Sequence, residues 1–242
     1  MDWQDTGILL TVRPHGETSV IADIFTAEHG RHAGIIRGGI SRKMKPMLQP
    51  GAQLRVHWQA RLESHLGSYR AELERSRAAD VMSTRLCLEG ANAIFSLLSR
   101  CLPEREPLPY LYAMSVALLD HIEDTSGWLA DYVRWEAALL GDVGFGLDLD
   151  SCAATGGTQD LVFVSPKSGR AVSAAAGAPY QDKLLKLPAF MANRRLEVSD
   201  QDVLDGLALT GYFLQNRVIA SVGGSALPDA RARLVDLIRR RG

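Results

Sequence analysis

Seven cationic side chains lie in a stretch of the chain that holds no acidic residue. Between Glu28 and Glu63 the sequence contains neither aspartate nor glutamate. The cations of this basic stretch are Arg31, Arg37, Arg42, Lys43, Lys45, Arg55 and Arg61. Clustered arginine and lysine attract a polyanion, and the usual polyanion is nucleic acid. The alternative is a solvated loop with a few basic side chains, and the charge count alone does not separate the two.

The rest of the chain is not basic. The formal net charge of all 242 residues is −1. Residues 1–80 hold eleven basic and nine acidic side chains, a net charge of +2, whereas residues 81–242 hold sixteen and nineteen, a net charge of −3. We therefore expect any nucleic-acid interface to lie in the first third of the chain, on the basic stretch.

Motifs for enzymatic chemistry are absent from the sequence. It contains no glycine loop ending in Lys-Ser or Lys-Thr, no Gly-x-Ser-x-Gly and no His-Glu-x-x-His, so we expect neither catalysis nor a cofactor. His29 and His32 follow Glu28 without a credible set of metal ligands, and we expect surface histidines. The three cysteines form no disulfide framework, and Cys152, in a glycine-rich loop, is expected to be exposed.

Five short segments position the basic stretch. They are rich in apolar and β-branched residues and are separated by turn formers, as is typical of strands. The segments are Gly7–Arg13, Val20–Phe25, Arg31–Arg37, Gln53–Gln59 and Leu66–Leu73. In the fourth, Leu54, Val56 and Trp58 alternate with polar residues, so we expect Trp58 in the core. The pattern predicts a five-stranded OB-fold barrel over residues 1–80, with Arg37–Lys45 as a flexible loop whose two glycines approach phosphate.

Helical periodicity begins after Asp80 and predicts a mainly α-helical domain over residues 81–242. We expect helices through Leu86–Cys101, from Pro107, from a cap at Ser126, from Ser199 and from Pro228. An insert at about residues 145–180 contains Leu161–Val164 and Arg170–Ser173 on either side of a turn, which predicts a β-hairpin. The fold class is thus α+β with two domains.

The sequence also bears on location. No apolar run reaches the roughly 20 residues that a membrane-spanning helix needs. The first residues lack the basic and apolar regions of a secretory signal. We therefore expect a cytoplasmic protein.

Several motifs resemble one family. They are Gly7–Ser19, which contains Arg-Pro-His-Gly-Glu-Thr-Ser, then Asp23–Arg31, the Arg37-Gly-Gly loop, Leu48-Gln-Pro50 and Arg134–Phe145. Together they resemble the RecO family of bacterial recombination mediators over essentially the whole chain. The resemblance implies an OB domain, a helical domain and a zinc-ribbon-like insert.

The resemblance also implies a function and partners. RecO proteins bind single- and double-stranded DNA, anneal complementary strands and, with RecR, load RecA onto DNA coated with single-strand-binding protein (SSB). This implies a nucleoid-associated DNA-repair protein that uses the basic stretch as its DNA-binding site. The alternative is a protein-interaction scaffold that binds DNA only in complex with RecR.

Two further expectations rest on the resemblance. Arg134 matches an arginine that contacts the acidic C-terminal tail of SSB, and Tyr112 and Leu140 are candidates to wall that pocket; alternatively Arg134 pairs with Asp131 or Glu136. The family's two Cys-x-x-Cys zinc pairs stand here as Cys152-Ala-Ala-Thr and Ser173-Ala-Ala-Ala. One thiolate cannot make a four-coordinate zinc site, so a metal-free insert is predicted.

Overall fold

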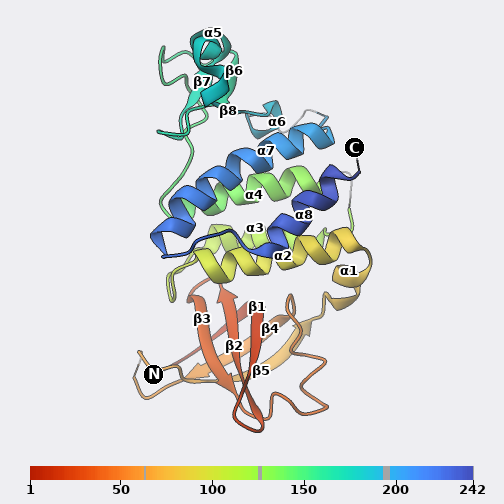
Figure 1. Ribbon diagram of the computed structural model, residues 1–242. Helices are drawn as coiled ribbons and strands as arrows, with labels where there is room; N and C mark the ends of the chain where they lie inside the picture. The colour runs from red at the N-terminus through yellow and green to blue at the C-terminus, as the bar shows by residue number, and fades with distance from the viewer. Residues whose placement is uncertain (63, 125–126, 193–196, 242) are drawn as a thin grey trace. The chain divides into compact units, whose positions relative to one another are not determined.

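A computed structural model describes residues 1–62, 64–124, 127–192 and 197–241 (Figure 1). The chain forms two compact units, Met1–Glu123 and Asp124–Gly242. Strands give way to helices near residue 80, as the sequence indicates, but the first three helices belong to the first compact unit. The predicted helix cap Ser126 lies outside the described residues.

The first unit contains a five-stranded barrel. Its strands are β1 (Asp2–His15), β2 (Ser19–Thr26), β3 (Gly30–Ile36), β4 (Gln53–Gln59) and β5 (Ser68–Arg75). They pair in the order β1-β2-β3-β5-β4, and β4 closes the barrel on β1. All pairs are antiparallel except β3 with β5. This order confirms the predicted five-stranded barrel, which Figure 1 shows in red to orange.

Alternating side chains fill the barrel. On β4, Leu54, Val56 and Trp58 are at most 1% exposed, whereas Arg55 and Gln59 face solvent. The Trp58 indole donates a hydrogen bond to the Leu66 carbonyl at 3.1 Å. Trp58 therefore belongs to the core, as predicted, and offers no face for stacking a base.

Three helices complete the first unit: α1 (Ala78–Met82), α2 (Arg85–Cys101) and α3 (Pro109–Asp120). The prediction that Pro107 opens a helix is wrong, because Pro109 takes the first turn of α3. Arg77, between the barrel and α1, is only 2% exposed. Its guanidinium donates to Asp120 at 2.6 Å and to the Gly51 carbonyl at 2.9 Å, so it ties α3 to the barrel.

The second unit is built on helices α4 (Trp128–Asp142), α7 (Asp200–Phe213) and α8 (Asp229–Arg239). The π-helical turn η2 (Leu214–Ile219) extends α7, and the short α6 spans Ala189–Ala192. Ser199 and Asp202 form the predicted cap of α7. Among the described residues, no helix is both long and apolar enough to cross a membrane.

One buried ion pair joins these three helices. Glu136 of α4 is fully buried and receives two hydrogen bonds from Arg231 of α8, at 2.7 and 2.8 Å. The hydroxyl of Thr210, on α7, donates to the same carboxylate. Because burying an ion is costly unless it is paired, this network needs all three helices in place.

The insert holds a three-stranded sheet in the order β7-β6-β8. The hairpin of β6 (Leu161–Val164) and β7 (Ala171–Ser173) was predicted, whereas β8 (Leu185–Lys186) was not. Two short helical turns, α5 (Ala174–Gly177) and η1 (Ala178–Lys183), connect β7 to β8. The insert is shown in teal in Figure 1.

Cys152 packs into this insert, and the expectation that it is exposed is wrong. The residue is 1% exposed, and its sulfur accepts a hydrogen bond from the Ser173 N–H at 3.3 Å. Hydrogen bonds with Ser173 and Thr155 lower the pKa of the thiol to about 6. One sulfur beside two hydroxyl side chains does not fit the four nitrogen, sulfur or carboxylate ligands of structural zinc.

Candidate nucleic-acid interface

The connection between β3 and β4, which carries most of the basic stretch, is a hydrogen-bonded turn. The Ser41 carbonyl accepts from the N–H groups of Met44 and Lys45, at 3.1 and 2.9 Å. Gln49 donates from its side-chain amide to the Lys45 carbonyl at 2.8 Å. Met44 packs against the barrel core, and Leu48 is buried. The loop that carries these cations thus has hydrogen bonds of its own.

The two glycines of this loop have structural reasons to be glycine. Gly38 has a φ of +70°, which side chains with a Cβ rarely adopt. A Cβ on Gly39 would lie 2.5 Å from a methyl carbon of Val20. Their presence is therefore explained by backbone conformation and packing, without a phosphate.

A hollow of about 510 Å³ lies where this loop meets the ends of β3 and β5. Its wall includes Arg37, Met44, Gln59, Ser68 and Arg70. Ile36 pairs with Tyr69 in the parallel register of β3 and β5, and an arginine follows each: Arg37 directly after β3 and Arg70 on β5. We call this the barrel hollow. Sequence reasoning missed Arg70; its side chain points away from the core because it follows Tyr69, which the structure buries.

Six exposed cations, of which Arg37 and Arg70 line the barrel hollow, form no ion pair with another described residue. The other four follow β3 or β4 in the sequence. We call all six the open cations. They are Arg37, Arg42, Lys43, Lys45, Arg61 and Arg70. Tyr69, the aromatic residue in the hollow's wall, is 4% exposed. The arrangement can neutralise phosphates, but it offers no open ring for stacking bases.

The other two arginines of the basic stretch have acidic partners. Arg55 pairs with Glu74 at 2.9 Å on the outer face of the barrel, where 62% of its side chain is exposed. Arg31 is 16% exposed; it pairs with Asp23 at 2.9 Å and donates to the Leu102 carbonyl at 3.1 Å. Burial raises the pKa of Asp23, and Arg31 opposes that rise. Arg31 thus holds the barrel to the segment after α2 and is not available to a phosphate.

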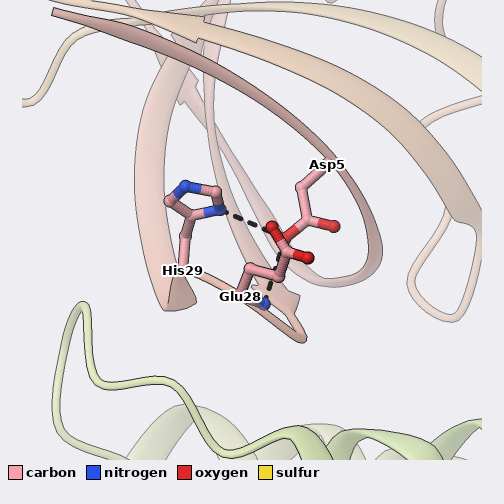
Figure 2. Close-up of side chains that lie close together, drawn as sticks. All are labelled: Asp5, Glu28 and His29. Atoms are coloured by element: carbon pink, nitrogen blue, oxygen red, sulfur yellow. Dashed lines mark hydrogen bonds and ion pairs between the residues drawn. The ribbon is translucent and has the colours of Figure 1, made fainter.

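Asp5, Glu28 and His29 each offer one possible metal-ligand atom, and these atoms lie within 4.8 Å of one another (Figure 2). Asp5 supplies the carboxylate that sequence reasoning did not place beside His29. Its carboxylate already accepts from Thr6 N–H at 2.7 Å, Glu28 N–H at 3.2 Å and His29 Nδ1 at 3.1 Å. These bonds tie the β2–β3 turn to β1, and we assign the cluster to the barrel's structure.

The two histidines beside Glu28 differ. His29 stacks on Trp3 with ring centroids 4.0 Å apart and planes inclined by 7°. His32 is 3% exposed, so the expectation of a surface histidine is wrong for it. Burial lowers the pKa of His32. It therefore packs in the barrel as a neutral ring.

The residues expected at an SSB-tail site each have contacts within their own unit. Arg134 pairs with Asp131 at 2.8 Å, donates to the Phe190 carbonyl at 3.0 Å and lies over the Phe190 ring. Leu140 is fully buried in the same unit. Tyr112 belongs to the first unit, where its hydroxyl donates to the Thr6 carbonyl at 3.0 Å. Leu140 is therefore part of the core of the second unit, and Tyr112 is hydrogen-bonded within the first.

Comparisons with known proteins cover both units. Residues 1–77 match the family described as "Recombination protein O N terminal", and residues 85–222 match "Recombination protein O C terminal". A "DNA repair protein RecO" of Ruegeria sp. (strain TM1040) is 53% identical over 241 residues, which covers 100% of both chains. The protein of the same name from Dinoroseobacter shibae is 48% identical over 99% of each chain. That of Jannaschia sp. (strain CCS1) is 51% identical, over 99% of this chain and 97% of its own.

Proposed function

The chain belongs to the RecO family of DNA repair proteins, and from this premise we propose that its barrel binds the phosphate backbone of DNA. The observation that carries the proposal is the set of open cations, two of which, Arg37 and Arg70, line the barrel hollow. Exposed cations without acidic partners keep their full charge for a polyanion. Because none of the described residues in the wall of the hollow is an exposed aromatic residue, binding is electrostatic and tolerant of sequence.

We further propose that this binding serves recombination without catalysis. Cations that neutralise the phosphates of two strands reduce their repulsion, so complementary strands meet and anneal. With RecR as partner, the protein displaces SSB from single-stranded DNA and helps to load RecA. Binding to double-stranded DNA uses the same open cations and places the protein on the bacterial nucleoid.

The proposed attachment to SSB is at Arg134. Its guanidinium holds Asp131, an exposed carboxylate whose place an acidic peptide tail can take. The exchange of one carboxylate for another keeps the charge-assisted hydrogen bond. Attachment to the tail raises the local concentration of the mediator on coated DNA. Arg134→Ala should abolish binding of a tail peptide at low salt, whereas Arg239→Ala, which removes a cation of α8 also paired at i,i+3, should not.

The DNA interface is tested by titrating a labelled single-stranded oligonucleotide with the full chain at several salt concentrations. The triple variant Arg37→Ala, Arg42→Ala, Lys43→Ala removes three open cations. Each lost phosphate contact flattens the slope of log K against log salt by about 0.7, so the slope should flatten by about 2. Over the tenfold range from 1 M to 0.1 M salt, a slope difference of about 2 corresponds to a loss of affinity of about a hundredfold.

A matched control removes three exposed cations from other places, with Arg85→Ala, Arg100→Ala and Lys183→Ala. It should leave the slope nearly unchanged. Equal losses in the two triple variants would show that net charge, and not the barrel hollow, governs binding.

The alternative is a scaffold that binds DNA only together with RecR. The oligonucleotide titration at several salt concentrations distinguishes the two functions. Salt-dependent binding by the isolated chain supports the barrel interface, whereas binding that requires added RecR supports the scaffold.

A further inference from the structure

A second hollow lies in the compact unit Asp124–Gly242, where the β6–β7 turn, the segment after α4 and the end of α7 meet. Its volume is about 310 Å³. Lys167 and Arg217 line it together with glycines and two phenylalanines, and none of the described residues in its wall is acidic. We call it the hairpin hollow. Residues 81–242 carry more acidic than basic side chains, so this is a local gathering of positive charge.

Several residues that line the hairpin hollow carry hydrogen-bond donors without an acceptor in the described part of the chain. Arg217 donates one bond from its guanidinium to the Lys167 carbonyl at 2.9 Å, which holds the group in place and leaves its other N–H groups open. The Lys167 ammonium forms no ion pair within the described part of the chain. The backbone N–H groups of Gly146, Lys167 and Ser168 likewise have no acceptor among the described residues. Cations and unpaired N–H groups around one concavity form a site for an anion.

The backbone that carries Arg217 is unusual. This residue lies within η2, the π-helical turn Leu214–Ile219. Turns of this kind are rare and occur frequently at functional sites. Gly169, at the end of the β6–β7 turn, has a φ of +72°. The two sides of the hairpin hollow are thus fixed by conformations that ordinary helix and strand do not supply.

The apolar part of the wall narrows the class of ligand. Phe145 is partly exposed and Phe213 is 3% exposed. A volume of about 310 Å³ is at the lower end of the range of small-molecule sites, about 300–1,000 Å³, and too small for a duplex. An anionic group attached to a flat ring that can stack on an aromatic side chain satisfies both parts of the wall, and a nucleotide has this composition.

We propose that the hairpin hollow binds one nucleotide of single-stranded DNA, with its phosphate against Lys167 and Arg217 and its base against Phe145. The proposal rests on the proposed function, because it adds a second DNA contact to that of the barrel. An aromatic wall accepts every base, so the site is tolerant of sequence.

The test titrates deoxycytidine 5′-monophosphate into the full chain labelled with ¹⁵N and follows the amide signals of Gly146, Ser168 and Gly169. These signals should shift, and Lys167→Ala or Arg217→Ala should weaken binding at least about fivefold, as expected for the loss of a hydrogen bond to a charged group. Lys167→Ala leaves the carbonyl that accepts from Arg217, so the turn keeps that bond. The control is Arg170→Gln, a cation of the same hairpin that pairs with Asp148 and lies outside the wall.

The test separates this site from the barrel. In the triple variant of the barrel the nucleotide should still shift the three amides, whatever happens to oligonucleotide binding. Unshifted amides would overturn the hairpin site even if the barrel binds DNA. Equal affinity for inorganic phosphate would overturn the contact with the base. An acidic peptide that shifts these amides where the nucleotide does not would make the hairpin hollow a peptide site instead.

Discussion

The arginines of the barrel hollow and the buried arginines of the two units differ in what they contact. Arg37 and Arg70 face solvent without an acidic partner among the described residues. Arg77 and Arg231 are 2% and 5% exposed, and each donates to a carboxylate and to a backbone carbonyl. An exposed, unpaired arginine can give up its bound water and counterions and bind a phosphate. A buried, paired arginine holds secondary-structure elements together. The contacts of each arginine, and not its charge, therefore decide what it does.

The largest effect we expect is on stability, at Arg231. Arg231→Ala leaves the fully buried Glu136 without its cation. Removing one partner of a buried ion pair costs about 3–5 kcal/mol. The free energy of unfolding from urea titrations, followed by circular dichroism, measures this loss.

A double variant controls for the loss of packing. Glu136→Leu with Arg231→Met removes both charges and keeps apolar volume, and such replacements of buried pairs are often neutral or stabilising. It should therefore recover most of the stability. A double variant as unstable as Arg231→Ala would contradict the assignment of the loss to an unpaired charge.

Arg31 and Arg37 give the sharpest test of the comparison within the basic stretch. Arg31→Ala deprives the partly buried Asp23 and the Leu102 carbonyl of their donor, at a cost of about 1–3 kcal/mol in the free energy of unfolding. It should leave the salt slope of DNA binding unchanged. Arg37→Ala should flatten the salt slope of DNA binding. It should change the free energy of unfolding by no more than about 0.5 kcal/mol, as is usual for surface substitutions.

Both measurements are needed on both variants. Urea titration gives the stability, and oligonucleotide titration at several salt concentrations gives the slope. If Arg31→Ala flattens the slope as much as Arg37→Ala does, the distinction between structural and open cations fails.

The barrel could be predicted from the sequence because its signals are local. Alternation on β4 and turn residues between strands are read within a few positions, and the structure confirms five strands. The two-residue strand β8 is too short to show a period. The start of α3 was placed at Pro107 instead of Pro109, because proline in a first turn is compatible with either position.

The candidate site was less predictable because its contacts are not local. In the sequence, Arg31 and Arg37 look alike. Asp23, Leu102 and Glu104, which surround Arg31, come from other segments of the chain. Arg70 was missed because it lies beyond the acid-free stretch, and only the pairing of β3 with β5 brings it beside Arg37. The bonds of Glu136 with Arg231 likewise join positions that no short motif links.

A smaller effect separates Arg70 from Arg55. Arg70→Ala removes an open cation of the barrel hollow and should lower affinity for single-stranded DNA about fivefold at 0.1 M salt, the value of one phosphate contact. Arg55→Ala removes a cation that Glu74 already neutralises, so it should cost less. Fluorescence anisotropy with a labelled oligonucleotide measures both. An equal or larger loss from Arg55→Ala would move the interface to the outer face of β4.

A still smaller effect should appear in the pH dependence of stability, through His32. Burial lowers its pKa in the folded protein, whereas the unfolded chain keeps a value of about 6.5. The unfolded state therefore takes up a proton first as pH falls. The stabilisation is nearly complete at about pH 7.5 and decreases as the pH falls through 6.5, by at most about 0.8 kcal/mol at pH 6.

The control for this effect is His32→Phe, which keeps a ring next to Trp58 but cannot titrate. The fall in stability between pH 7.5 and pH 6 should be smaller in this variant than in the natural chain. Identical falls, measured by urea titration, would show that His32 does not contribute.

The smallest expected effect is the response of the insert to a chelator. A structural zinc site contributes directly to folding, so its removal unfolds the part that it holds. Here Cys152 packs against Ser173, and the position of the fourth family ligand is Ala176, which offers no ligand atom. Dialysis against EDTA should therefore leave the urea midpoint unchanged, and the purified protein should hold far less than one zinc per chain. Zinc that stays at one equivalent after dialysis, together with a midpoint lowered by EDTA, would show that other residues supply the missing ligands.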